Sequence, residues 1–268
     1  MKSNRSARMN AMHFHVLTAR YFRQIFTNLG IFLPLLLEAP ILLILLIVVC
    51  KADSFTLKAV TDANTVIFLL VVMSALMGIL NSYREICKER EVLAREVFGG
   101  LDVNAYALSK FVVLAVFGAG QTLILFGGAA LYVDFAFASP AAAYPLCWLA
   151  LYLTNLATVA IGLFLSALLK RSESAILPVL LIIIACVVFS DCVLVLGGAA
   201  GYLRYITPTA WGAAVFGKFT ELNGWYATFS RELYGCSPFL SLAVLAAETL
   251  LFLFATIACL HWKFRKKD

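Results

Sequence analysis

The sequence predicts an all-α polytopic membrane protein with six transmembrane helices, and three observations support this fold class. Of the 268 residues, 63% are hydrophobic and 13% are charged, whereas soluble domains average roughly 45–50% apolar and about 25% charged residues. The mean hydropathy is +0.94. Six apolar windows also reach the length of about 20 residues that a spanning helix needs. The composition excludes a soluble globular domain, a disordered chain and a small disulfide scaffold.

Residues 1–30 are predicted to form a cytoplasmic tail and an amphipathic helix. Phe14, Leu17, Tyr21 and Ile25 recur at spacings of three and four, which is typical of one helical face. Basic and polar residues occupy the opposite side. A helix divided in this way lies in the membrane interface with its aromatic residues in the lipid. The alternative is an ordinary extension of the first span.

Six spans are expected after this helix, and three of them carry an acidic residue. Glu38, Asp191 and Glu248 are costly in contact with lipid, so we expect them to face protein or water. Pro140 and Pro145 indicate a loop and a helix start before the fourth span. The windows are Ile31–Cys50, Ala63–Tyr83, Phe111–Val133, a stretch within Ala143–Leu169, Ser174–Leu196 and Phe239–Leu260.

The basic residues predict the orientation, because Lys and Arg accumulate in cytoplasmic loops. With both termini in the cytoplasm, the outer side carries five of the 21 basic residues, namely Lys51, Lys58, Arg204, Lys218 and Arg231. We therefore expect a multi-pass protein of the inner (plasma) membrane. The net charge of +6 is explained by this distribution and by anionic lipid. It does not indicate a nucleic-acid partner.

The segment Arg84–Gly100 is the most charged part of the chain. Its apolar residues recur at helical spacing, and the two glycines at its end are typical of a helix stop. Asp102 or Asn104 can cap the helix that follows. Residues 84–110 are thus expected to form a short cytoplasmic helix, a turn and the start of the third span. The alternative is a solvated loop between spans.

Residues 197–238 form the longest predicted outer loop and are rich in tyrosine, tryptophan and phenylalanine. Aromatic residues at this density are typical of the boundary between membrane and water. We expect short helices that fold back towards the outer leaflet, with protein covering their interrupted backbone. This loop is therefore predicted to be a re-entrant outer region.

The sequence lacks the patterns of known catalytic sites, such as GxSxG and HExxH. We expect no catalytic, cofactor-binding or metal-binding residue in this chain. From these residues alone, two kinds of function remain open. One is an ion- or proton-coupled secondary transporter that uses Glu38, Asp191 and Glu248. The other is a membrane scaffold that does not transport, or an intramembrane enzyme.

The order of these elements resembles an ABC-2 type transporter permease, similar to the bacterial membrane domains of the G-subfamily type (the type V exporter fold). The resemblance rests on Leu17–Asn28 with Leu37–Pro40, on Arg84–Lys110 and on Ile206–Gly212. The second of these is the most specific, because a Lys-Glu-Arg run, an Arg-Glu pair, a turn and a Tyr-x-x-Ser-Lys stretch follow in order. Glu38 stands where the family commonly has Gln.

The resemblance implies roles for particular residues. Residues implied in coupling to an ATPase are Arg84, Glu85, Lys88, Glu89, Arg90, Arg95 and Glu96. Residues implied along the substrate path, on the second, fourth and fifth spans, are Ser74, Met77, Asn155, Phe189 and Ser190. Pro208 and Trp211 are implied in an outer gate.

The resemblance also implies the partners. Two copies of a nucleotide-binding ATPase subunit would hold ATP and Mg²⁺, and a second permease copy or a homologous permease would complete the path in the lipid. Because only about thirty residues precede the first span, we expect the ATPase to be a separate subunit or a part of a longer fused protein. The function implied is ATP-driven export.

Overall fold

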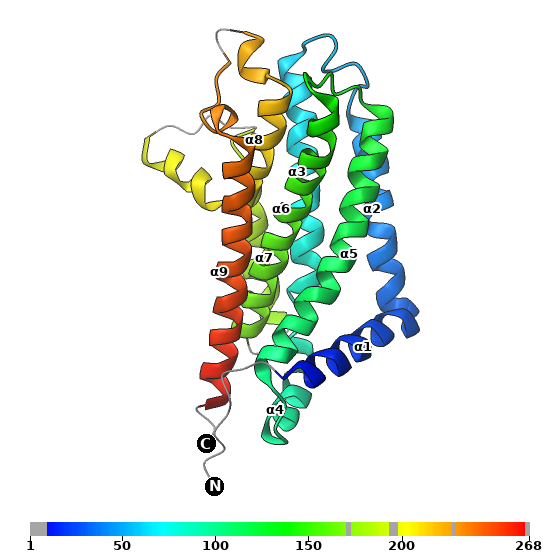
Figure 1. Cartoon of the computed structure of the whole chain (residues 1–268), viewed down its shortest axis with the longest axis vertical. Helices are drawn as coiled ribbons and strands as arrows, with labels where there is room; N and C mark the ends of the chain where they lie inside the picture. The colour runs from blue at the N-terminus through cyan, green and yellow to red at the C-terminus, as the bar shows by residue number, and fades with distance from the viewer. Residues whose placement is uncertain (1–9, 170–172, 193–197, 227–228, 266–268) are drawn as a thin grey trace.

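The structure, a computed structural model, describes residues 10–169, 173–192, 198–226 and 229–265. Figure 1 shows long helices that run side by side, with α1 and α4 together at one end of the bundle. We call this the α4 end. The α-helices in the described ranges are α1 (Ala11–Thr27), α2 (Leu29–Val49), α3 (Val60–Ser82), α4 (Arg90–Phe98), α5 (Val103–Tyr132), α6 (Pro140–Leu168), α7 (Ile176–Val188), α8 (Pro208–Phe219) and α9 (Pro238–Arg265).

Five helices are long and apolar enough to cross a membrane, namely α2, α3, α5, α6 and α9. They confirm the predicted helical segments one to four and six. Helix α5 begins earlier than Phe111, because the Asp102 carboxylate accepts a hydrogen bond from the Asn104 N–H and caps the helix at Val103. Helix α6 begins at Pro140. Proline lacks a backbone N–H, which costs nothing here because the first N–H groups of a helix have no partner within the helix. Pro145 therefore lies inside the helix.

The predicted fifth span differs from the structure. Helix α7 has 13 residues and ends at Val188, which gives a length of about 20 Å at 1.5 Å per residue. The chain then turns, with Asp191 at φ 60°, so Asp191 lies beyond the helix that was expected to carry it. Two threonines before and within α8 donate hydrogen bonds to the carbonyls of Phe189 and Cys186 and so stabilise this early end. Residues 193–196 of the predicted span lie outside the described ranges.

Helix α6 lies at the centre of the bundle and packs against α3 and α9. The contact with α3 is close because small residues face each other. A Cβ on Gly78 would lie 2.2 Å from Thr158 Oγ1, and one on Gly162 would lie 2.0 Å from Ser82 Oγ. Small residues at such positions allow two helix backbones to approach in a membrane. The α3–α6 pair is therefore a rigid centre.

Helix α1 lies across the α4 end of the bundle (Figure 1). Its stripe of Leu17, Tyr21 and Ile25 is buried, and the helix packs against α5. The prediction that Tyr21 points into lipid is therefore wrong, because Lys110 of α5 and Glu85 of the segment before α4 cover it. Phe26, on the neighbouring stripe, stays 55% exposed. The helix itself is confirmed, within the described residues from 10 onwards.

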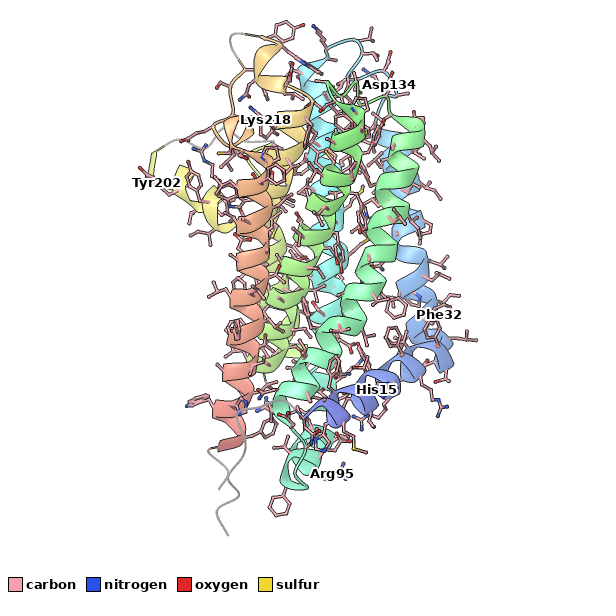
Figure 2. The ribbon with its side chains drawn as sticks, in the orientation of Figure 1. His15, Phe32, Arg95, Asp134, Tyr202 and Lys218 are labelled. Carbon is pink, nitrogen blue, oxygen red and sulfur yellow. The ribbon has the colours of Figure 1, made fainter. Side chains whose placement is uncertain are left out.

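The outer region contains short helices, as predicted, within residues 198–226 and 229–238. Three short 3₁₀ segments accompany α8, namely η3 (Gly198–Ile206), η4 (Leu222–Gly224) and η5 (Leu233–Gly235). Helix α8 is buried against α3, α6 and α9. Figure 2 shows Lys218 at the opposite end from α4 and Tyr202 on a segment that projects from the side. Protein thus covers the backbone of α8, whereas η3 stays partly exposed, with Tyr202 72% exposed.

Candidate functional site

The segment between α3 and α5 forms a rigid elbow at the α4 end. Ser166 on α6 accepts hydrogen bonds from the N–H groups of Ile86 and Cys87, at 2.9 and 3.0 Å. The segment η1 (Cys87–Glu89) and then α4 follow. Helix α4 ends at a glycine pair whose second member, Gly100, has φ 99°, a conformation that favours glycine. The Asp102 cap then starts α5, so local sequence features fix both ends of the elbow.

A buried ion-pair cluster joins this elbow to α5. Lys110 on α5 is 3% exposed, and its Nζ lies 2.9 Å from a Glu89 oxygen and 3.4 Å from a Glu85 oxygen. Lys88 also pairs with Glu85. Tyr106 donates a hydrogen bond of 3.0 Å to Glu89. Two carboxylates and two ammonium groups thus balance each other, which makes burial of the charges tolerable.

Helix α1 joins the same cluster through Tyr21, whose hydroxyl donates a hydrogen bond to Glu85. The Tyr21 ring also lies under Lys110, with Nζ 3.7 Å from the ring centroid, a favourable cation–π distance. Burial, and then the charge of Glu85, raise the pKa of Tyr21 well above 10. The phenol therefore stays a hydrogen-bond donor at neutral pH. We call Tyr21, Glu85, Lys88, Glu89, Tyr106 and Lys110 the elbow cluster.

Further contacts fasten α4 on its sides. Arg20 on α1 forms a two-point ion pair with Glu96, at 2.6 and 3.3 Å. This contact with Glu96 raises the pKa of Arg20. Arg90 donates a hydrogen bond of 2.7 Å to the Leu169 carbonyl at the end of α6. Helix α4 is therefore held by α1, α5 and α6 together.

The remaining side of α4 faces outwards. Phe98 is 90% exposed and Val92 is 46% exposed, and Glu91 and Arg95 are exposed beside them. Figure 2 places Arg95 at the far α4 end of the bundle. An exposed phenylalanine among charged residues on a braced helix is suited to contact with another protein. We call Glu91, Val92, Arg95 and Phe98 the outer face of α4.

The seven residues implied in coupling thus divide into two groups. Glu85 and Glu89 lie inside the elbow cluster, and Arg90 and Glu96 are held by neighbouring helices. Arg84 and Arg95 lie at the surface, and Lys88, which belongs to the elbow cluster, is exposed as well. The sequence analysis did not assign a role in coupling to Tyr21, Tyr106, Lys110 or Ser166. A signal for Lys110 was present, because a lysine at the start of an apolar window needs an acidic partner.

The residues implied along a substrate path are packed in this structure. The Ser74 hydroxyl donates a hydrogen bond of 2.7 Å to the Leu151 carbonyl, and the Asn155 amide donates one of 3.0 Å to the Ser74 carbonyl. Met77 is fully buried. Phe189 is partly buried, and Ser190 donates a hydrogen bond to the Val187 carbonyl in the turn after α7. Ser74, Met77 and Asn155 therefore belong to the packed region of α3 and α6.

The residues implied in an outer gate lie at the start of α8. Pro208 is the first residue of the helix. Trp211 is 7% exposed, and its indole N–H donates a hydrogen bond of 2.9 Å to the Tyr205 carbonyl. The Trp211 side chain thus fixes α8 to η3, and Pro208 starts the helix. A cavity of about 10 Å³, with room for about one water molecule, lies nearby between α3, α6 and α7.

The three acidic residues of the predicted spans are on separate elements. Glu38 accepts a hydrogen bond of 3.1 Å from Gln121 on α5. Asp191 pairs with Arg204 at 3.6 Å, a basic partner that the sequence analysis did not expect. Glu248 on α9 has one buried oxygen without a hydrogen-bond partner among the described residues. Within the described residues, no three His, Cys, Asp or Glu side chains lie close enough together to hold a metal ion.

Comparison with known proteins agrees with this architecture. The family model "ABC-2 type transporter" matches residues 12–218, from α1 to the end of α8. No curated protein matches the chain. The match covers well over half of the 268 residues. The chain therefore belongs to the ABC-2 type transporter family, as the multi-pass permease component of an ABC-type transporter that pairs with an ATP-binding subunit.

Proposed function

We propose that this chain is the transmembrane subunit of an ATP-driven exporter in the plasma membrane, with both termini and the α4 end in the cytoplasm. A separate ATPase would bind ATP and Mg²⁺ and would dock on the outer face of α4. One observation carries the proposal: α4 is fastened to α1, α5 and α6 on its inner sides while Phe98 projects from its outer side. Movement of the ATPase can then reach the spans through α4.

The elbow cluster supports this assignment because it joins parts of the chain that are far apart in sequence. Tyr21 and Glu85 are separated by 64 residues. A push on α4 displaces Glu85 and Glu89, and both are attached to α5 through Lys110. Arg95 would meet the ATPase surface directly, whereas Arg84 and Lys88, which precede α4, would move with it. The movement would be transmitted, without contact with the ATPase, by Glu85, Glu89, Arg90 and Glu96.

We further propose that two copies of the chain, or this chain and a homologous permease, form the path together with two ATPases. The exposed face of α7 supports this arrangement, because Leu177, Leu180 and Leu181 are 49–66% exposed. The path would lie between α3 and α7 of the two permeases. Ser74, Met77, Asn155, Phe189 and Ser190 would become accessible only when these helices separate, with Pro208 and Trp211 controlling the outer end.

The experiment is to tag the chain, extract it gently from its native membrane and identify the proteins that purify with it by mass spectrometry. We expect a stoichiometric ATPase. Phe98→Asp should release the ATPase without lowering the melting temperature, because the ring is 90% exposed. The matched control is Leu57→Asp, which alters a residue that is 69% exposed in the loop at the opposite end. This control should retain the ATPase.

Two results would count against the proposal. If no ATPase purifies with the chain in several mild detergents and in nanodiscs, the ATP-driven assignment is wrong. If Phe98→Asp retains the ATPase as fully as Leu57→Asp does, the docking surface is elsewhere.

A further inference from the structure

A cleft of about 530 Å³ opens between α1, α2, α3 and α5 at the α4 end. Its volume lies within the range of small-molecule sites, about 300–1,000 Å³. One wall is apolar and contains Ile31, Pro34 and Leu35 of α2, Leu80 of α3 and Leu114 of α5. The cleft is distinct from the outer face of α4 and from the α3–α7 region that the proposed function uses.

The apolar wall continues into the outer surface of α2. Leu33, Leu36 and Leu37 on this helix are 42–51% exposed, and only 17% of its most apolar window is buried. A helix with this composition and exposure is surrounded by acyl chains in a membrane. A lipid in the bilayer can therefore reach the cleft from the side of α2.

The polar wall contains one cation, Arg84, that has no ion-pair partner among the described residues. Arg84 and Lys88 line the cleft together with Glu85. Glu85 and Glu89 are already balanced by Lys88 and Lys110. Arg84 is exposed, stacks on the Tyr83 ring at 4.8 Å and forms no ion pair within the described part of the chain. One cation is thus left over beside an apolar wall.

The carboxylate of Glu38 also lines the cleft, further along α2. Gln121 on α5 donates a hydrogen bond to it and also donates one to the Leu35 carbonyl, which fixes its position on α2. Asn81 in turn donates a hydrogen bond of 3.1 Å to Gln121. This network crosses from α2 to α3 and α5 and forms part of the cleft's lining.

We propose that this cleft binds one anionic phospholipid, with its phosphate at Arg84 and an acyl chain along Ile31, Pro34, Leu35 and Leu80. The rest of the lipid would stay in the bilayer beside α2. Anionic lipids are concentrated in the cytoplasmic leaflet, which agrees with the orientation given under the proposed function. Arg84 and Lys88 belong to the segment that leads into α4. Bound lipid would therefore stabilise the elbow and make its position depend on leaflet composition.

The experiment measures the melting temperature of the delipidated full chain in non-ionic detergent as lipid is added. We expect dioleoyl phosphatidylglycerol to raise it in a saturable way and dioleoyl phosphatidylcholine to have little effect. Arg84→Gln should weaken the apparent affinity about fivefold, the effect typical of one cation near an anionic surface. The matched control is Arg23→Gln, which removes an exposed arginine of α1 that does not line the cleft.

A second pair of variants tests the apolar wall. Leu80→Trp should narrow the cleft and abolish the shift, whereas Leu36→Trp, on the exposed side of α2, should preserve it. The proposal is overturned if phosphatidylcholine stabilises equally, if glycerol phosphate without acyl chains stabilises equally, or if each variant matches its control. Phe98→Asp should leave the lipid effect unchanged. Failure of this proposal is therefore distinguishable from failure of ATPase docking.

Discussion

Lys110→Met keeps the length of the side chain but removes the cation that Glu85 and Glu89 share. In the native chain Lys110 Nζ lies 2.9 Å from Glu89 and 3.4 Å from Glu85 and is almost completely buried. After the substitution Glu85 keeps Lys88 and Tyr21 as partners, and Glu89 keeps Tyr106. Two carboxylates then remain in a partly buried site with one ammonium group, that of Lys88, which pairs with Glu85.

Removing one partner from a buried ion pair costs about 3–5 kcal/mol, because the other charge stays buried. The remaining partners place the expected loss at the lower end of this range, about 3 kcal/mol. Lost cation–π contact with Tyr21 acts in the same direction. The double variant Lys110→Met with Glu89→Gln should recover part of the loss, since it removes one of the uncompensated carboxylates.

The assay is reversible unfolding in mixed micelles with increasing dodecyl sulfate. The matched control is Lys51→Met, because Lys51 pairs with Asp62 at 2.9 Å but its side chain is 72% exposed. Exposed ion pairs contribute little, so the control should change the free energy of unfolding far less. The reasoning is refuted if the two variants lose equal stability, or if Glu89→Gln deepens the loss caused by Lys110→Met.

Three further outcomes follow from the packing and the polar contacts. Gly78→Ala should lower the free energy of unfolding by about 1–3 kcal/mol through overpacking against α6. In the control Gly127→Ala the added Cβ meets no atom within 4 Å, so the free energy of unfolding should stay unchanged or rise slightly. Equal effects of the two variants in an unfolding titration would contradict this. The pKa of Tyr21 is raised, so the contribution of its phenol to the free energy of unfolding falls as pH rises above 10. Because this phenol stays protonated where ordinary tyrosines ionise, Tyr21→Phe should leave the tyrosinate absorbance gained between pH 9 and 11 unchanged. Glu38→Gln should retain transport in vesicles, because a glutamine oxygen can still accept from Gln121; complete loss would favour a proton-coupled carrier instead.

The long helices and the elbow could be predicted from the sequence because their signals are local. A run of about 20 apolar residues predicts a span wherever it lies. Asp102 and the glycines after Phe98 fix the helix ends through contacts within a few residues. The resemblance to the ABC-2 family added the functional meaning of this segment, and the family match confirms the family.

The elbow cluster and the end of α7 could not be predicted in this way, since they depend on contacts between distant residues. Tyr21 was expected to face lipid because its spacing shows an apolar stripe but not what covers it. Asp191 was expected inside a span because hydropathy continues past Val188. The stop at Val188 depends on a threonine of α8, Thr209, which donates to the Cys186 carbonyl at 2.7 Å.

The central position of α6 has a consequence for biogenesis. Helix α6 packs against α3, which is synthesised before it, and against α9, which ends at Arg265. About 100 residues separate the ends of α6 and α9, and ribosomes add roughly 5–20 residues per second. One flank of α6 therefore waits about 5–20 s for its partner. During that interval lipid or an insertion chaperone has to shield this flank, so a ribosome stalled before α9 would leave an intermediate that membrane proteases can recognise.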